Sequence, residues 1–269
     1  MKRIDLEELK KIQLDVMQVF HDFCIAHDIK YSLGGGSLLG AIRHNGYIPW
    51  DDDIDVYMLR SEYNKFLEQF PELYQGIYKV ASFERDKSWN RAYGKLYDTR
   101  NVLKEQKTSN EKHLGVNLDL FPIDFVPSDE REWSLYNKKR KFLLSLFYSK
   151  LTTLRGDRSL INNLSIVTLK CFTFLIPLRF LGKMINRYAQ RYNGKENQFV
   201  FTTAEGWRVK KPYHASVYDT YELHQFEDRK FYIMAGYDEA LRNLYGDDYM
   251  QLPPENKRIT HYYVDAYWK

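Results

Sequence analysis

A glycine-rich turn followed by closely spaced aspartates constrains this chain more than any other feature. Gly34 to Ser37 separates the alternating residues 29–33, a predicted strand, from a short helix expected over Leu38 to His44 with Ser37 as its N-cap. A Gly-Gly-Ser turn between a strand and a helix presents backbone N–H groups that can hold a phosphate. Gly36 and Ser37 are therefore the candidate phosphate-binding residues.

Asp53 and Asp55 come next, at the start of an apolar segment that predicts a strand. Residues i and i+2 of a strand project from the same face, so both carboxylates point to one place. They repel each other unless a hard cation neutralises them, and oxygen ligands suit Mg²⁺ or Mn²⁺. Asp119, in the alternating residues 116–121, is the candidate third carboxylate. This combination indicates metal-dependent transfer at a phosphorus centre.

Other interpretations of these residues are simpler. A glycine turn alone is more often only a turn, and an acidic run is usually a solvated loop; their ordered combination favours a site. A calcium-binding loop is a further alternative, because four acids fall at its positions 1, 3, 5 and 12: Asp51, Asp53, Asp55 and Glu62. We reject it, because Val56 stands where that loop requires glycine.

The remaining pattern predicts a mixed α/β (α+β) chain. Further helices are expected over 5–26, after Ser61, and over 237–245, and strands over 78–83, 91–97 and 102–105. Neither an internal repeat nor a flexible linker interrupts residues 1–269. We therefore expect a single catalytic domain, with a largely helical insertion at about 127–196.

Charge is distributed unevenly along the chain. The sequence has 40 Lys and Arg against 36 Asp and Glu, but residues 131–195 hold fourteen of the former and only two of the latter. Such a segment favours an anionic partner. Residues 164–181 are strongly apolar but contain Lys170 and Arg179, so we do not expect a membrane-spanning helix. The segment could lie on an anionic membrane surface or pack onto the core; we slightly favour the membrane, and we disfavour nucleic acid.

The chain resembles the LicD family of phosphocholine transferases and related fukutin-type enzymes. Gly35 to His44 and Gly46 to Asp55 resemble the signature of that family, and 118–124 and 244–250 are further matches. The resemblance extends from the N-terminal helix to the C-terminus. It implies a nucleotidyltransferase-like mixed sheet with flanking helices.

By this resemblance, the protein moves phosphocholine, or a related alcohol phosphate, from a CDP-alcohol to a glycan hydroxyl and releases CMP. Asp53 and Asp55 would hold Mg²⁺ or Mn²⁺, and Asp119 would accept the proton of the hydroxyl or share the metal, with Asp124 as its competitor. Gly36 and Ser37 would hold phosphate. Further candidate substrate-binding residues, each with an equally good structural role, are Arg43, His44, Arg91 and Lys95.

The substrates are less well defined than the reaction. The donor would be CDP-choline or another CDP-alcohol, and the acceptor a lipopolysaccharide, a teichoic-acid precursor or another cell-surface glycan, free or lipid-linked. Aromatic candidates for a choline cage are Tyr47, Trp50, Trp207 and Tyr249. The alternatives are a nucleotidyltransferase that releases pyrophosphate, and a non-catalytic glycan- or nucleic-acid-binding module. Two distant cysteines and no apolar run near the N-terminus favour the cytoplasm, with contact at the inner face of the plasma membrane.

Overall fold

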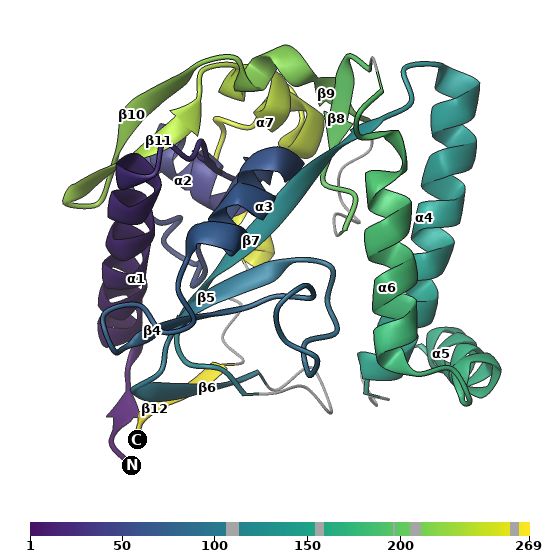
Figure 1. Cartoon of the computed structure of the whole chain (residues 1–269), viewed down its shortest axis with the longest axis horizontal. Coiled ribbons are helices and arrows are strands. Elements are labelled where there is room, and N and C mark those ends of the chain that lie inside the picture. The colour runs from purple at the N-terminus through teal and green to yellow at the C-terminus, as the bar shows by residue number, and fades with distance from the viewer. Residues whose placement is uncertain (106–112, 154–158, 196, 205–210, 259–263) are drawn as a thin grey trace.

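The computed structural model describes residues 1–105, 113–153, 159–195, 197–204, 211–258 and 264–269 (Figure 1). The helices in these ranges are α1 (Leu6–Ala26), α2 (Gly35–His44), α3 (Arg60–Gln69), α4 (Glu130–Leu151), α5 (Leu160–Thr173), α6 (Leu178–Ala189) and α7 (Tyr237–Tyr245), with the short 3-10 helices η1 (Gln190–Tyr192), η2 (Ala215–Tyr218) and η3 (Glu255–Lys257). The strands are β1 (Arg3–Ile4), β2 (Ser32–Leu33), β3 (Asp55–Leu59), β4 (Tyr78–Ala81), β5 (Gly94–Asp98), β6 (Asn101–Glu105), β7 (Asn117–Val126), β8 (Phe199–Phe201), β9 (Tyr213–His214), β10 (Tyr221–Phe226), β11 (Arg229–Met234) and β12 (Val264–Trp268). The predicted mixed α/β (α+β) class is confirmed.

The central sheet has the strand order β2-β3-β7-β5-β4, and β8 and β9 extend it from β7. β3 and β7 are parallel, whereas the other neighbouring pairs are antiparallel. The register places Asp55 of β3 beside Asp119 of β7, and Lys95 of β5 on the other side of Asp119. The two strands that carry predicted carboxylates are therefore direct neighbours.

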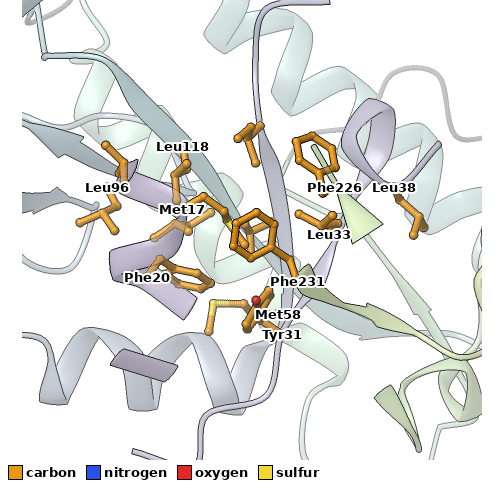
Figure 2. Close-up of a cluster of buried hydrophobic side chains, with 14 of the residues drawn as sticks. Met17, Phe20, Tyr31, Leu33, Leu38, Met58, Leu96, Leu118, Phe226 and Phe231 are labelled. Carbon is orange, nitrogen blue, oxygen red and sulfur yellow. The ribbon is translucent and has the colours of Figure 1, made fainter. Parts of the chain in front are cut away.

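The two faces of this sheet differ in chemistry. On one face the strands contribute fully buried apolar side chains: Val56, Met58, Leu96, Leu118 and Leu120. Helices α1 and α3 contact this part of the sheet, and Figure 2 shows Met17 and Phe20 of α1 among these side chains. Because side chains alternate along a strand, the intervening residues of the same strands project from the opposite face, which carries the polar residues.

Helix α1 confirms the amphipathic pattern expected over 5–26. Asp5 is the N-cap, and its carboxylate accepts a hydrogen bond from the backbone N–H of Glu8 at 2.8 Å. The apolar residues at spacings of three and four are buried: Leu9, Ile12, Val16, Phe20 and Phe23. The helix therefore covers the apolar face of the sheet with one continuous stripe.

Helix α2 begins three residues earlier than the pattern predicted. Its first residue is Gly35 and its N-cap is Gly34, so the prediction of Ser37 as N-cap was wrong. The Ser37 hydroxyl instead accepts a hydrogen bond from the backbone N–H of Asp55 at 2.9 Å. A serine capping rule describes local contacts only, and here a long-range contact to β3 competes with the local one.

The strand limits also differ from the predicted ones. Only Ser32–Leu33 of 29–33 form a strand, and β5 begins at Gly94, so Arg91 lies in the preceding loop. Strand β7 continues through Pro122 to Val126. The proline is tolerated because β5 pairs with Asn117 to Leu120 and β8 with Asp124 to Val126, which leaves Pro122 between these two neighbours.

Helices α4, α5 and α6 lie between β7 and β8 in the chain. In Figure 1, α4 and α6 run side by side and α5 lies across one end of the pair. Leu144 and Phe147 of α4 pack with Leu181 and Ile185 of α6 in a separate apolar cluster. No single described helix is long and apolar enough to cross a membrane; α5 and residues 178–192 meet that test only as a pair, with a bend of 96° between them.

Candidate functional site

Three charged residues form a row across neighbouring strands on the polar face of the sheet. Lys95 Nζ lies 2.7 Å from Asp119 Oδ1, and Asp55 is the register partner of Asp119 on its other side. The same Nζ donates a hydrogen bond to Asn117 Oδ1 at 3.0 Å. Asn117 and Asp119 thus lie on the same face of β7, and Lys95 bridges the two side chains.

Asp53 lies just before β3, in a partly buried run of three aspartates. Burial raises the pKa of Asp53 well above its usual range, and the negative charges of Asp51, Asp119 and Asp52 raise it further, while Lys95 opposes them. The backbone on both sides is held in place: Gln13 Nε2 donates to the carbonyl of Asp52 at 2.9 Å, and the Asp119 N–H donates to the carbonyl of Ile54 at 3.0 Å. The charge of Asp119 is thus one of those that act on Asp53.

The start of α2 lies against these carboxylates. Gly35 has φ +50°, and a Cβ built on it would lie 2.6 Å from Asp55 Oδ2. A Cβ on Gly36 would lie 2.6 Å from Asp51 Oδ2. The positive φ of Gly35 favours glycine at this close approach, a Cβ on Gly36 would displace the end of the Asp51 side chain, and the positive end of the helix dipole is directed at the acidic residues. Gly36 and Ser37 thus lie beside Asp51 and Asp55, where the sequence predicted a phosphate cradle.

The donor chemistry of this site suits a divalent metal ion. Carboxylate oxygens of Asp53, Asp55 and Asp119 are hard ligands of the type that Mg²⁺ and Mn²⁺ prefer, and Gly35 lets the backbone at the start of α2 approach the Asp55 carboxylate closely. Among the residues that the structure describes, no group of three or more acidic, histidine or cysteine side chains is already arranged around a metal position. Lys95 supplies positive charge to Asp119 in this arrangement.

Arg43 and His44 end α2 and contact the C-terminal part of the chain. Arg43 donates from Nη1 to the carbonyls of Tyr249 and Gln251, at 2.7 and 3.1 Å, and from Nε to His44 Nε2 at 3.0 Å. Burial, and then the charge of Arg43, lower the pKa of His44. The structure therefore gives Arg43 a role in joining α2 to residues 249–251.

Arg91 and Lys95, predicted together, are in different surroundings. Arg91 is buried, donates to the Tyr93 hydroxyl at 2.6 Å, and lies 6.0 Å from the ring centroid of Tyr148 on α4. Lys95 is also buried but is directed at the acidic residues. Of these two candidates, the structure brings Lys95 to the site.

Asp124 is enclosed in a separate polar network. Its carboxylate is fully buried and receives two hydrogen bonds from the Arg60 guanidinium, each at 2.8 Å. Asn193 and Thr203 donate to the same carboxylate, both at 2.7 Å. These contacts satisfy the carboxylate within the protein, so Asp119 rather than Asp124 is the group on the polar face beside Asp55.

The aromatic candidates for a choline cage do not form one cluster. Tyr47 is buried and donates to Gln13 Oε1 at 3.1 Å, and Tyr249 donates to Asp238 Oδ1 at 2.8 Å. The Trp50 ring contacts His44 at a centroid distance of 6.2 Å and Arg258 at 5.3 Å. Trp207 lies outside the described residues.

Sequence reasoning missed two tyrosines beside the glycine turn. Tyr57 contacts the position that a Cβ on Gly34 would occupy, and the Tyr245 hydroxyl lies 4.0 Å from the Cβ position of Gly36. Tyr57 is two residues after Asp55 on β3, so strand alternation would have placed both on one face. Tyr245 comes from the end of α7, and no local pattern could connect it to Gly36.

Comparison with known proteins identifies a family and relatives that this chain resembles. The family model described as "LicD/FKTN/FKRP, nucleotidyltransferase domain" matches residues 28–177. The chain is 32% identical over 273 residues to a lipopolysaccharide cholinephosphotransferase, LicD, of Haemophilus influenzae, with 99% of each chain covered. It is 31% identical over 143 residues to an uncharacterized protein of Rickettsia typhi, which covers 52% of this chain and 43% of that one. The family match contains the glycine turn, the aspartates and Lys95.

Proposed function

The chain belongs to the LicD family, and we propose that it is a metal-dependent phosphotransferase that moves phosphocholine from CDP-choline, or a related alcohol phosphate from another CDP-alcohol, to a glycan hydroxyl, with release of CMP. The full-length similarity to a lipopolysaccharide cholinephosphotransferase supports the transferred group and a lipopolysaccharide-type acceptor. The observation that carries the proposal is the row of Lys95, Asp119 and Asp55 beside the glycine turn.

In this proposal Asp53 and Asp55 hold Mg²⁺ or Mn²⁺. When bound, the ion neutralises the pyrophosphate oxygens of the donor and the charge that develops on the leaving group. Burial and, after it, the neighbouring carboxylates raise the pKa of Asp53, and the second cause supports this assignment because a divalent cation would relieve that repulsion. Asp51 and Asp52 add to the negative potential of the site.

Asp119 is the proposed general base. Its carboxylate accepts the proton of the acceptor hydroxyl while the oxygen attacks the phosphorus of the alcohol phosphate. The P–O bond to the bridging oxygen of the pyrophosphate breaks, and CMP leaves with that oxygen. Lys95, at 2.7 Å from Asp119, orients the carboxylate before proton transfer. Lys95 is therefore a positioning residue in this account.

The backbone N–H groups of the Gly36–Ser37 turn are proposed to bind donor phosphate oxygens at the N-terminus of α2. The adjacent carboxylates would repel this phosphate without a cation, which is why the cradle and the metal ligands act together. We propose that the reaction takes place at the inner face of the plasma membrane, where a lipid-linked glycan acceptor would be met.

A nucleotidyltransferase that releases pyrophosphate is the second candidate, since the matching family model is described as a nucleotidyltransferase domain. The product distinguishes the two reactions. The purified protein is incubated with CDP-choline, CDP-ethanolamine, CDP-ribitol or CDP-glycerol, or with CTP, together with lipopolysaccharide or teichoic-acid precursor and Mg²⁺ or Mn²⁺. We expect CMP from a CDP-alcohol, and Asp22→Asn, an exposed carboxylate on α1, serves as the matched control for the site variants.

A further inference from the structure

Helix α5 presents an apolar face to solvent. Leu160, Ile161 and Leu164 are 87%, 76% and 66% exposed, and Phe172 near the other end is 75% exposed. The turn that follows continues the surface, with Phe174 79% and Leu175 87% exposed. Thr173 is the only residue of the helix that is buried. A surface helix in contact with water normally shows the opposite arrangement.

The exposed apolar residues lie on one side of the helix. At 100° per residue, Leu160, Leu164, Val167 and Cys171 form one stripe with Ile161 and Phe172 beside it, whereas the less exposed Ile166 and Leu169 lie with Thr173 on the other side. That inner side contacts α4. Lys150 of α4 fixes the end of α5, because its Nζ donates to the carbonyls of Thr173 and Ile176 at 2.7 and 2.6 Å. The outer stripe therefore remains exposed to solvent when α5 packs against α4.

The charged residues that α5, α6 and α4 from Trp133 onward contribute all have one sign. Residues 133–153 and 159–195 contain no Asp or Glu. On α6, Lys183 and Arg187 are exposed and share a face with the exposed Phe180 and Met184. Because a helix rises about 1.5 Å per residue, Lys183 lies about 8 Å along α6 from Leu178, where α6 leaves the α5 turn. The apolar residues of α5 and its turn are thus followed along α6 by basic side chains, in the order in which a bilayer presents its acyl chains and its headgroups.

We propose that α5 and the turn after it, residues 160–176, dock this protein on an anionic lipid bilayer, with α5 lying in the membrane interface. The 96° bend between α5 and α6 lets α5 lie flat while α6 and α4 rise away from the surface (Figure 1). The positive charge favours an anionic bilayer over a second copy of the chain, because two copies joined through α5 would bring like charges together. The docking is independent of the transfer chemistry.

The basic residues of α4 and α6 differ in exposure. Arg140 of α4 is buried, with its guanidinium 4.8 Å from the Phe201 ring centroid. Exposed Lys183 and Arg187 are closer along the chain to the apolar turn.

Co-sedimentation with vesicles tests the proposal. The wild-type protein is mixed at low salt with phosphatidylcholine vesicles or with vesicles that also contain phosphatidylglycerol. We expect binding to the anionic vesicles and at least tenfold weaker binding to the neutral ones. The variant Leu160→Asn, Leu164→Asn, Val167→Asn should lose at least tenfold in binding, and Lys183→Gln with Arg187→Gln about fivefold for each charge removed.

Matched controls use exposed residues of the same kinds elsewhere on the protein. Ile25→Asn, Leu73→Asn, Leu223→Asn removes three apolar side chains that are 53%, 45% and 51% exposed, and Lys11→Gln with Lys230→Gln removes two exposed charges. Both should bind as the wild type does. Asp53→Asn should also bind normally, so a failure of the proposed transfer reaction does not affect this test.

A fluorescent label reports whether α5 itself enters the interface. Cys171 is exposed on the apolar stripe and Cys24 is buried, so a thiol-reactive, polarity-sensitive dye selects Cys171. We expect a blue shift with anionic vesicles, and none for the same dye on Leu73→Cys in a Cys171→Ser background. Absence of binding to anionic vesicles, unchanged binding of the α5 variant, or a dimer in solution that shields Cys171 from the dye would each overturn the proposal.

Discussion

Lys95 Nζ and Asp119 Oδ1 form an ion pair at 2.7 Å between two side chains that face each other across β5 and β7. The pair lies in line with Asp55 on β3, so the positive charge of Lys95 is placed at the edge of a cluster of carboxylates. In the proposed mechanism, this contact fixes the orientation of the carboxylate that accepts the proton.

Replacing Lys95 should show whether this residue positions Asp119 for the reaction or only stabilises the fold. In Lys95→Gln, Asp119 loses its ionic partner and Asp53 loses the charge that lowers its pKa. We expect kcat to fall by about 10²-fold, the scale for loss of one organised charged contact in an active site. The acid side of the pH profile should move to higher pH, because Asp53 would protonate more readily. A purely structural role would lower stability without moving the profile.

Asp53→Asn should stabilise the metal-free protein while removing transfer. Because the pKa of Asp53 is raised, the folded protein binds a proton at this carboxylate more tightly than the unfolded chain does. The free energy of unfolding therefore falls as pH rises from about 3.9, the ordinary pKa of Asp, through the pKa of the folded state. At pH 7 the variant does not bury an ionised carboxylate at this position, so its Tm should be about 2 °C or more above that of the wild type. The difference should vanish below pH 4. Thermal unfolding in EDTA measures it, and a lower Tm at pH 7 would contradict the account.

Asp119→Asn distinguishes a base from a metal ligand. The amide can still accept a hydrogen bond from Lys95, so the fold should survive. If Asp119 is the base, transfer should fall by 10²-fold to 10⁴-fold, within the usual range for general-base catalysis, and CDP-choline binding with Mg²⁺ should stay within about twofold. Isothermal titration measures that binding. A parallel loss of metal affinity would make Asp119 a ligand, and unchanged turnover would remove it from the reaction.

Gly35→Ala tests the close approach of α2 to the carboxylates. The new Cβ would have to displace Asp55 Oδ2, and φ +50° adds about 1 kcal/mol of backbone cost. Gly76→Ala is the matched control, because Gly76 has φ +70° and nothing within 4 Å of its Cβ position. Both variants should lose similar stability from the backbone. Only Gly35→Ala should lose transfer by tenfold or more, and equal activity of the two would contradict the proposed cradle.

Local sequence rules were sufficient for much of this fold. The Asp5 cap and the spacing from Leu9 to Phe23 define α1, and helix α7 has the predicted limits. Alternation along 116–121 placed Asp119 on the polar face. These features depend on residues close together in the chain, where periodicity and capping are informative.

Long-range contacts account for the differences. Ser37 contacts the backbone of Asp55 rather than capping α2, and Asp124 is satisfied by Arg60, Asn193 and Thr203, which come from distant segments. The ion pair of Lys95 depends on which strand lies beside β7, and local sequence patterns do not determine the order of strands in a sheet. The same limit applies to α5, whose apolar residues resemble those of a core helix until its packing is known.

The most direct test of the central claim is the yield of CMP relative to transferred choline phosphate. The protein is incubated with CDP-choline labelled in the choline methyl groups, a lipopolysaccharide acceptor that lacks phosphocholine, and Mg²⁺ or Mn²⁺. We predict one CMP for each labelled group on the acceptor, with both products abolished by EDTA and by Asp53→Asn or Asp55→Asn but not by Asp22→Asn. Equal transfer by the Asp53→Asn and wild-type proteins, or pyrophosphate from CTP without CMP from any CDP-alcohol, would contradict it.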